Sequence, residues 1–255
     1  MGMRVVADFG RADAQISTLQ RVVRWLTKFA PALIGAGAVG WLLLLVIILR
    51  DDARLAIGLV SLVTVVTLTA VAVPHWVEGF SAEIRQHTQK RTAQAELTNT
   101  LETYLDDGWT LYHDVPVNDT TVSILTGTRG VYLLDLLFSE QAGQVKADKW
   151  LFRDEDGDWE LSDNSPSRQA RTKATQLQQQ LETALPIRPR VVWAGSAVIL
   201  LDEPKTPVWW LAQPEVMLRD LRARDEAVSA ETLTQLNEKL EKLIEPTNAN
   251  ALFSM

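Results

Sequence analysis

The sequence contains no cysteine, which excludes disulfide bonds and thiolate metal sites. Histidine is also scarce, and His75, His87 and His113 do not show the spacing of a metal-ligand set. No internal repeat and no low-complexity tract is present. The length of 255 residues is enough for one ordinary domain and an accessory segment.

Basic residues are in the minority after residue 91. Residues 92–255 carry fifteen Lys/Arg against twenty-six Asp/Glu, whereas residues 1–91 carry ten against six. A dedicated nucleic-acid-binding domain normally has a basic surface. The charge distribution therefore argues against nucleic acid as the partner of the second part of the chain.

Two long uncharged runs precede that acidic part. They cover residues 29–49 and 55–77, twenty-one and twenty-three residues, and only RDDAR separates them. Each run exceeds the roughly 20 residues that a helix needs to cross a membrane. A cleaved signal peptide fits poorly, because the first run is too long and the second follows at once. The pattern predicts an antiparallel transmembrane hairpin.

Positive charges flank the predicted hairpin. Three basic residues precede the first span and three follow the second, while the two arginines of the loop are offset by two aspartates. The positive-inside rule then places both termini in the cytoplasm, so we expect a multi-pass protein of the cell (inner) membrane. The flanking residues are Arg21, Arg24, Lys28, Arg85, Lys90 and Arg91.

Two finer patterns occur in this first part. Ile16, Leu19, Val23 and Leu26 recur at helical spacing, which predicts an amphipathic helix at the membrane surface. Ala32, Ala36 and Gly40 form a small-residue stripe, suited to packing within the hairpin or to a dimer interface.

Together, the charge and hydropathy patterns predict the organisation of the chain. Residues 1–91 form the surface helix, hairpin and stalk, residues 92–246 a cytoplasmic domain, and residues 247–255 a tail.

The second part alternates between strand and helix patterns. Helical periodicity at residues 97–105 leads into the β-type runs WTLYHDV, TTVSILT, GVYLLDLLF, VKADKWLF and WEL. A long helix is expected from Ser165-Pro166, then the strands RVVWAGSAVILL and VWWLA, then the helices PEVMLRDLRAR and SAETLTQLNEKLEKLIE. DEDGD, residues 154–158, lacks the spacing of a calcium loop and is expected to be a hairpin turn. These elements predict an α/β fold with a mixed sheet and flanking helices.

One carboxylate, Asp135, lies within the otherwise apolar run GVYLLDLLF. A buried carboxylate is costly unless it finds a partner or takes up a proton. The preceding GTRG, residues 127–130, has the glycines of a tight β-turn, and this turn would place Val122 opposite Asp135, with Leu137 on the same face. A magnesium-dependent nuclease would need a second acid at Val122 and a lysine at Leu137.

The stretch 97–243 resembles the NERD (nuclease-related) domain, a branch of the PD-(D/E)xK nuclease superfamily. The resemblance rests on GWTLYHDV, GTRGVYLLDLL, SPSRQARTKATQLQQQL and the strands and helices that follow. It implies a restriction-endonuclease-like fold, with an acid before the turn and Glu-x-Lys after it. Asp135 then matches the acid of that triplet, Leu137 replaces its lysine, and Val122 replaces the first acid. Gln169 matches a helix glutamine, and Gln94 or Glu96 is nearest to a glutamate of the first helix.

Three functions are compatible with these residues. The first is a degenerate nuclease domain that acts as an interaction or scaffolding module for a protein partner, with Asp135 and Gln169 as a vestigial site and neither metal nor cofactor. The second is an active magnesium-dependent nuclease, with Asp135 on the metal and relocated residues elsewhere. Its lysine would come from Lys146, Lys149 or Lys173, and its second acid would be Asp119 or Glu96. The third is a structural subunit of a membrane complex, which the apolar Leu252 and Phe253 would favour.

Overall fold

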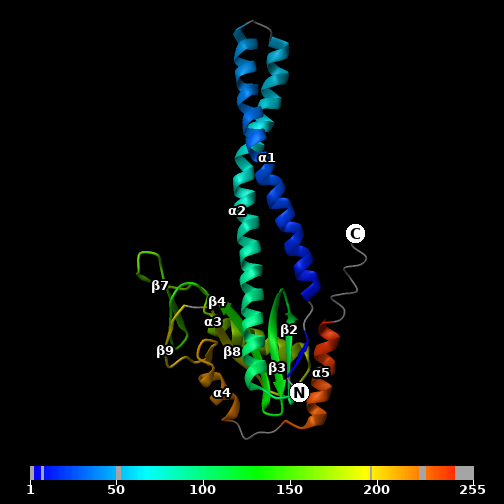
Figure 1. The fold of residues 1–255 in the computed structure, drawn as a ribbon, viewed down its shortest axis with the longest axis vertical. Coiled ribbons are helices and arrows are strands. Elements are labelled where there is room, and N and C mark those ends of the chain that lie inside the picture. Colours follow the sequence, from blue (N-terminus) through cyan, green and yellow to red (C-terminus); the bar gives the residue numbers. More distant parts are fainter. Residues whose placement is uncertain (1–2, 7–8, 50–52, 196, 224–227, 245–255) are drawn as a thin grey trace. The chain divides into compact units, whose positions relative to one another are not determined.

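The chain divides into two compact units in the computed structural model (Figure 1). The structure describes residues 3–6, 9–49, 53–195, 197–223 and 228–244. One unit, the helical unit, is Phe9–Thr88; the other, the α/β domain, combines Met1–Asp8 with Gln89–Met255. The predicted tail, 247–255, lies outside the described residues.

The helical unit consists of α1, Phe9–Leu49, and the first part of α2, Ala53–Tyr104. The predicted surface helix and first span belong to one helix, since α1 runs unbroken through Pro31. Within the described residues, Ser17–Leu43 is the stretch long and apolar enough to cross a membrane. The second predicted span, 55–77, lies in α2, and residues 50–52 of the loop are outside the described part. The two-span hairpin therefore stays a prediction.

A mixed six-stranded sheet forms the centre of the α/β domain, as the sequence pattern predicts. Its order is β1-β2-β3-β4-β8-β10, where β2, β3 and β4 are antiparallel and the other neighbours are parallel. The strands are β1 Arg4–Val6, β2 Trp109–Val117, β3 Thr120–Gly127, β4 Gly130–Phe138, β8 Ile187–Ala194 and β10 Val208–Trp210.

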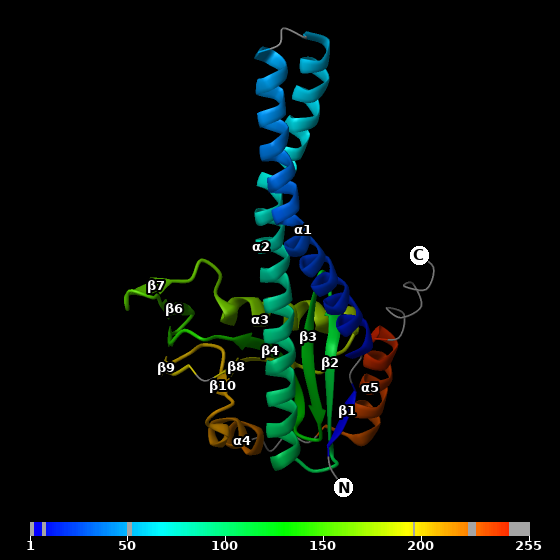
Figure 2. The ribbon, with the colours of Figure 1, turned by 45° about the horizontal axis from the view of Figure 1, so that its top comes forward.

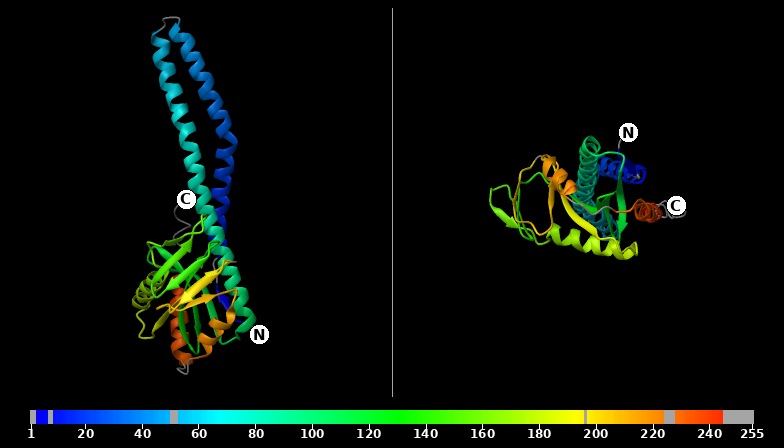
Figure 3. Two further views of the ribbon diagram at one scale, coloured as in Figure 1. Left: turned by 90° about the vertical axis from the view of Figure 1, so that its left-hand side faces the viewer. Right: turned by 90° about the horizontal axis from the view of Figure 1, so that it is seen from below.

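Helices cover both faces of this sheet (Figure 3, right). The end of α2 and α4, Pro214–Arg222, pack on one face through Leu97, Leu101 and Met217. On the other face lie α3, Pro166–Gln180, and α5, Ala230–Ile244, which bury Leu177 and Leu236. The predicted start of α3 is confirmed, because the Ser165 side chain caps its first turn and proline follows.

A second, smaller sheet packs beside the first. This accessory sheet has the order β7-β6-β5-β9, with β5 Gly143–Lys146, β6 Lys149–Arg153, β7 Trp159–Leu161 and β9 Ile199–Asp202. Trp150 and Val145 join it to Trp193 of β8 in one buried cluster. The turn expected at DEDGD is confirmed, since β6 and β7 pair as an antiparallel hairpin around it.

The N-terminal strand β1 is an element that the sequence analysis does not contain. Residues 4–6 pair in parallel with Thr110, Leu111 and Tyr112, and Met3 is buried in the same core as Leu111. Residues 1–8 thus belong to the α/β domain and not to the helical unit. A strand of three residues carries too few alternations to be recognised from its pattern.

Candidate functional site

The β3–β4 hairpin has the register expected from its turn. Five residue pairs, from Ser123–Leu134 to Gly127–Gly130, follow one register. The next pair in the same register would be Val122 and Asp135. Gly130 has φ +136°, a conformation that side chains disfavour. A Cβ on Gly127 would lie 2.4 Å from the Trp109 ring. Both glycines are therefore required where they stand.

Asp135 has a partner on the neighbouring helix. The Lys173 ammonium of α3 lies 2.7 Å from Asp135 Oδ1, and the two side chains are 18% and 15% exposed. The carboxylate is thus neutralised inside the protein by an ion pair. On either side of it, Val122 is buried in the apolar cluster beneath α3, and Leu137 packs against the cluster beneath the accessory sheet.

A pocket of about 390 Å³ lies next to this pair. Residues 117–120 of the β2–β3 turn form one wall, and α3 forms the other. Three of the residues considered from the sequence, Asp119, Gln169 and Lys173, line it together with Arg168. The fold therefore gathers residues from separate parts of the sequence around one hollow.

Other residues considered for the site lie elsewhere. Glu96 accepts a hydrogen bond from the Gly195 backbone N–H at 3.3 Å, and Gln94 donates to Asp114 at 3.1 Å. Lys146 lies 3.4 Å from the Asp202 carboxylate, and Lys149 is exposed at the start of β6. Of the three lysines weighed as substitutes, Lys173 is the one that reaches Asp135.

Residues 89–194 match the family model of NERD, the nuclease-related domain. The resemblance drawn from the sequence is thereby confirmed over this segment. The NERD segment begins in α2, ends at the last residue of β8, and contains both Asp135 and Lys173. Neither a curated protein nor a solved structure matches the chain.

At the positions that resemble the nuclease triplet, the β3–β4 hairpin offers one carboxylate, Asp135, to a divalent cation. Magnesium takes oxygen ligands and is usually held by at least one carboxylate that is free to bind it. Here the one carboxylate is bonded to an ammonium group, and the neighbouring Val122 and Leu137 offer only hydrocarbon. Among the described residues, no group of three or more Asp, Glu or His side chains is arranged to hold a metal ion.

A second polar cluster in the NERD segment surrounds Asp114. This residue sits in a bulge of β2 with φ 56°, and its carboxylate contacts Lys90 at 2.6 Å, Arg91 at 3.3 Å and Gln94 at 3.1 Å. Burial alone would raise the pKa of Asp114, but the hydrogen bond and charge of Lys90 outweigh it and hold that pKa below its usual value. No role for Asp114 was predicted from the sequence, although the polar pair HD within WTLYHDV was the available signal.

His113, next to Asp114, is completely buried. Its Nε2 is 2.8 Å from Thr98 Oγ1 and its Nδ1 is 2.8 Å from Ser123 Oγ. Burial lowers the pKa of the His113 imidazole to about 4, although the Asp114 carboxylate acts in the opposite direction. The ring is therefore neutral at pH 7 and bridges α2 and β3.

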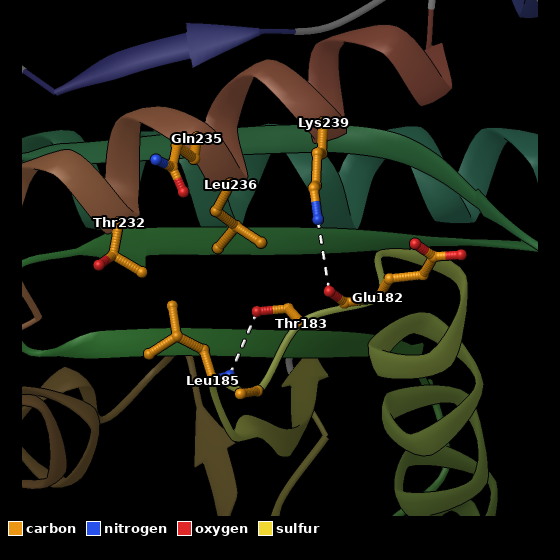
Figure 4. A pocket seen from close by; sticks show the side chains of 8 residues that line it. Glu182, Thr183, Leu185, Thr232, Gln235, Leu236 and Lys239 are labelled. Atoms are coloured by element: carbon orange, nitrogen blue, oxygen red, sulfur yellow. Dashed lines mark hydrogen bonds between the residues drawn. The ribbon is translucent and has the colours of Figure 1, made fainter.

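Another pocket, of about 400 Å³, separates α5 from the segment that follows α3 (Figure 4). Lys239 reaches across it and donates to the carbonyls of Leu181 and Glu182, at 2.7 and 3.4 Å. Thr183 Oγ1 accepts the Leu185 N–H at 3.2 Å. The lysine thus satisfies carbonyls at the end of α3, which gives this pocket a structural explanation.

Proposed function

We propose that the chain is a membrane-anchored, catalytically degenerate NERD protein that acts as an interaction or scaffolding module at the cytoplasmic face. The observation that carries this proposal is the Asp135–Lys173 ion pair. It leaves the single acid of the hairpin engaged in a protein contact, with hydrocarbon at Val122 and Leu137 where a nuclease needs an acid and a lysine.

Contacts within the helical unit support the membrane anchor. Gly40 lets α1 approach α2, because a Cβ there would lie 2.6 Å from Val63 Cγ2. One turn away, the Trp41 indole donates to Thr67 Oγ1 at 3.1 Å. Small residues and side-chain hydrogen bonds between helices are typical of packing in lipid.

The exposed residues of this unit have the chemistry of a lipid-facing surface. Trp25 and Phe29 of α1 stack at 4.8 Å, and Trp76 of α2 is also exposed. Counted from the Gly40–Val63 contact, Trp25 and Trp76 both lie about 20 Å along their helices, at 1.5 Å per residue. Aromatic side chains at one level, next to Arg21, Arg24 and Lys28, favour a membrane interface at that level.

A relocated nuclease site is the second candidate function. It is favoured by the pocket that Lys173 shares with Asp119 and Gln169. In that case Lys173 would supply the charge that Leu137 lacks.

Metal response and DNA cleavage distinguish the two candidates. We expect millimolar magnesium or manganese to leave the melting temperature of the purified chain unchanged, because an ion stabilises the folded chain only to the extent that it binds to it. No DNA cleavage is expected either. Metal stabilisation that disappears in Asp135→Asn, with cleavage that Lys173→Met abolishes and the control Lys149→Met preserves, would overturn the proposal.

A further inference from the structure

The accessory sheet concentrates the exposed apolar side chains of the α/β domain. Of seven large hydrophobic residues exposed among the described residues of this domain, five lie in or beside β7 and β9. They are Trp159, Leu161, Val198, Leu200 and Leu201, with exposed fractions from 39% to 61%. The α/β domain thus has one region where apolar surface remains open to an occupant.

Two of these side chains, Leu161 and Leu200, lie in one row across the sheet's open face, with Leu151 and Gln144 between them. Leu161 pairs with Leu151, Leu151 with Gln144, and Gln144 with Leu200, so the four residues lie side by side on neighbouring strands. The opposite face carries Val145 and Trp150, which are completely buried. The row therefore faces away from the core.

The outer edge of β7 also offers unpaired backbone groups. Within the hairpin, the carbonyl of Asp158 and the N–H of Ser162 bond towards β6 at 2.9 and 2.8 Å. Hydrogen bonding alternates along an antiparallel pair, so the N–H and C=O groups of Trp159 and Leu161 point to the open edge. Figure 2 shows β7 at the end of the accessory sheet. An exposed strand edge of this kind is a template for a further strand.

The charge around β7 selects the kind of strand that fits. Residues 153–163 contain six carboxylates against one arginine, and among the described residues none of the six is in an ion pair. A second copy of β7 or an anionic lipid surface would be repelled. The acidic residues would by themselves protect the β7 edge from pairing with other acidic strands. The two residues whose backbone groups face the open edge, Trp159 and Leu161, however, also expose apolar side chains, which a binding strand can contact.

We infer that β7 binds an extended segment of a protein partner in which basic and apolar residues alternate. The segment adds a strand to the accessory sheet, its apolar side chains extend the row of Leu161 and Leu151, and its basic side chains face the carboxylates of residues 154–163. This inference rests on the proposed interaction role and gives the partner its chemistry.

Binding of a fluorescent peptide of alternating lysine and valine to the full chain in detergent micelles tests the inference. Leu161→Pro removes one outward N–H without removing a bond to β6, and we expect at least a tenfold loss of affinity at an unchanged melting temperature. Leu201→Pro on the edge of β9 is the matched control and should bind normally. Lysines at positions 158 and 160, introduced by Asp158→Lys and Glu160→Lys, should shift the preference to a peptide with glutamate in place of lysine.

Equal binding of the lysine and glutamate peptides, or unchanged binding in Leu161→Pro, would overturn the inference. So would a dimer of the chain that Leu161→Pro dissociates, because the occupant would then be a second copy. DNA cleavage is measured on the same preparation. DNA cleavage together with peptide binding would refute the non-catalytic role but not the inference about β7. If the chain neither cleaves DNA nor binds the peptide, only the inference about β7 is refuted.

Discussion

The Asp135–Lys173 pair makes a quantitative prediction about stability. Its side chains are 15% and 18% exposed and its atoms are 2.7 Å apart, so removal of either charge leaves the other largely buried without a partner. Breaking a fully buried pair costs about 3–5 kcal/mol and an exposed pair up to about 1 kcal/mol. For this intermediate burial we expect about 2–3 kcal/mol for Asp135→Asn and for Lys173→Met.

The double variant should cost little more than either single variant, because the second substitution removes a charge that is already uncompensated. The expected coupling energy is about 2 kcal/mol. Urea unfolding of the full chain in detergent measures it, followed by tryptophan fluorescence, since six of the nine tryptophans lie in residues 109–210. At a slope of roughly 2 kcal/mol per molar urea, each single variant shifts the midpoint by about 1 M.

A matched control is the Arg4–Glu241 pair, which has a similar distance of 2.9 Å but side chains 64% and 36% exposed. The same cycle with Arg4→Met and Glu241→Gln should give a coupling below about 1 kcal/mol. Costs of Asp135→Asn and Lys173→Met that simply add, or a coupling no larger than that of the control, would refute the reasoning. The ion pair would then not be what holds the carboxylate in the sheet.

Three further predictions concern other parts of the molecule. The pKa of His113 is lowered from 6.5 to about 4 in the folded state, so the unfolded chain binds the proton more readily. About 3 kcal/mol of stability, present above pH 6.5, should therefore be lost as the pH falls to 4. His113→Gln should remove this part of the pH dependence of the urea midpoint. Asp220 accepts hydrogen bonds from the buried Arg190 guanidinium at 2.6 and 3.1 Å, and Asp220→Ala leaves that charge without its partner. The substitution should lower the free energy of unfolding by about 3–5 kcal/mol, whereas the double variant with Arg190→Met should recover much of the loss. A reporter fused after residue 255 should lie in the cytoplasm, and a signal from the other side of the membrane would reverse the proposed orientation.

Two contacts determine where a soluble fragment containing the NERD segment has to begin. Asp114 is held by Lys90 and Arg91, which a fragment beginning at residue 92 would lack. It would also lack β1, whose three residues pair with β2. The sequence pattern ends the second apolar run at residue 77, but it does not reveal which later residues of α2 contact the sheet.

Local rules in the sequence were enough for some of the individual elements, though not for β1 or for the division of RVVWAGSAVILL into β8 and β9. The glycines of GTRG define the turn, and the turn defines the register that places Val122 opposite Asp135, because a two-residue hairpin loop leaves one pairing. Ser165-Pro166 likewise marks the start of α3 through a cap and a proline. These features depend on residues a few positions apart, so they can be read without knowledge of the rest of the fold.

The partner of Asp135 was decided only by the tertiary structure. Arg168, Arg171 and Lys173 all lie in α3 and look alike in the sequence, yet Arg171 binds Asp148, Lys173 binds Asp135, and Arg168 is exposed beside the pocket. Which cation meets which carboxylate depends on how α3 crosses strands far away in the chain. The sequence by itself therefore predicted, from its resemblance to the NERD domain, that Asp135 occupies the place of a nuclease acid. The packing of α3 on the sheet determined that it is held by a lysine.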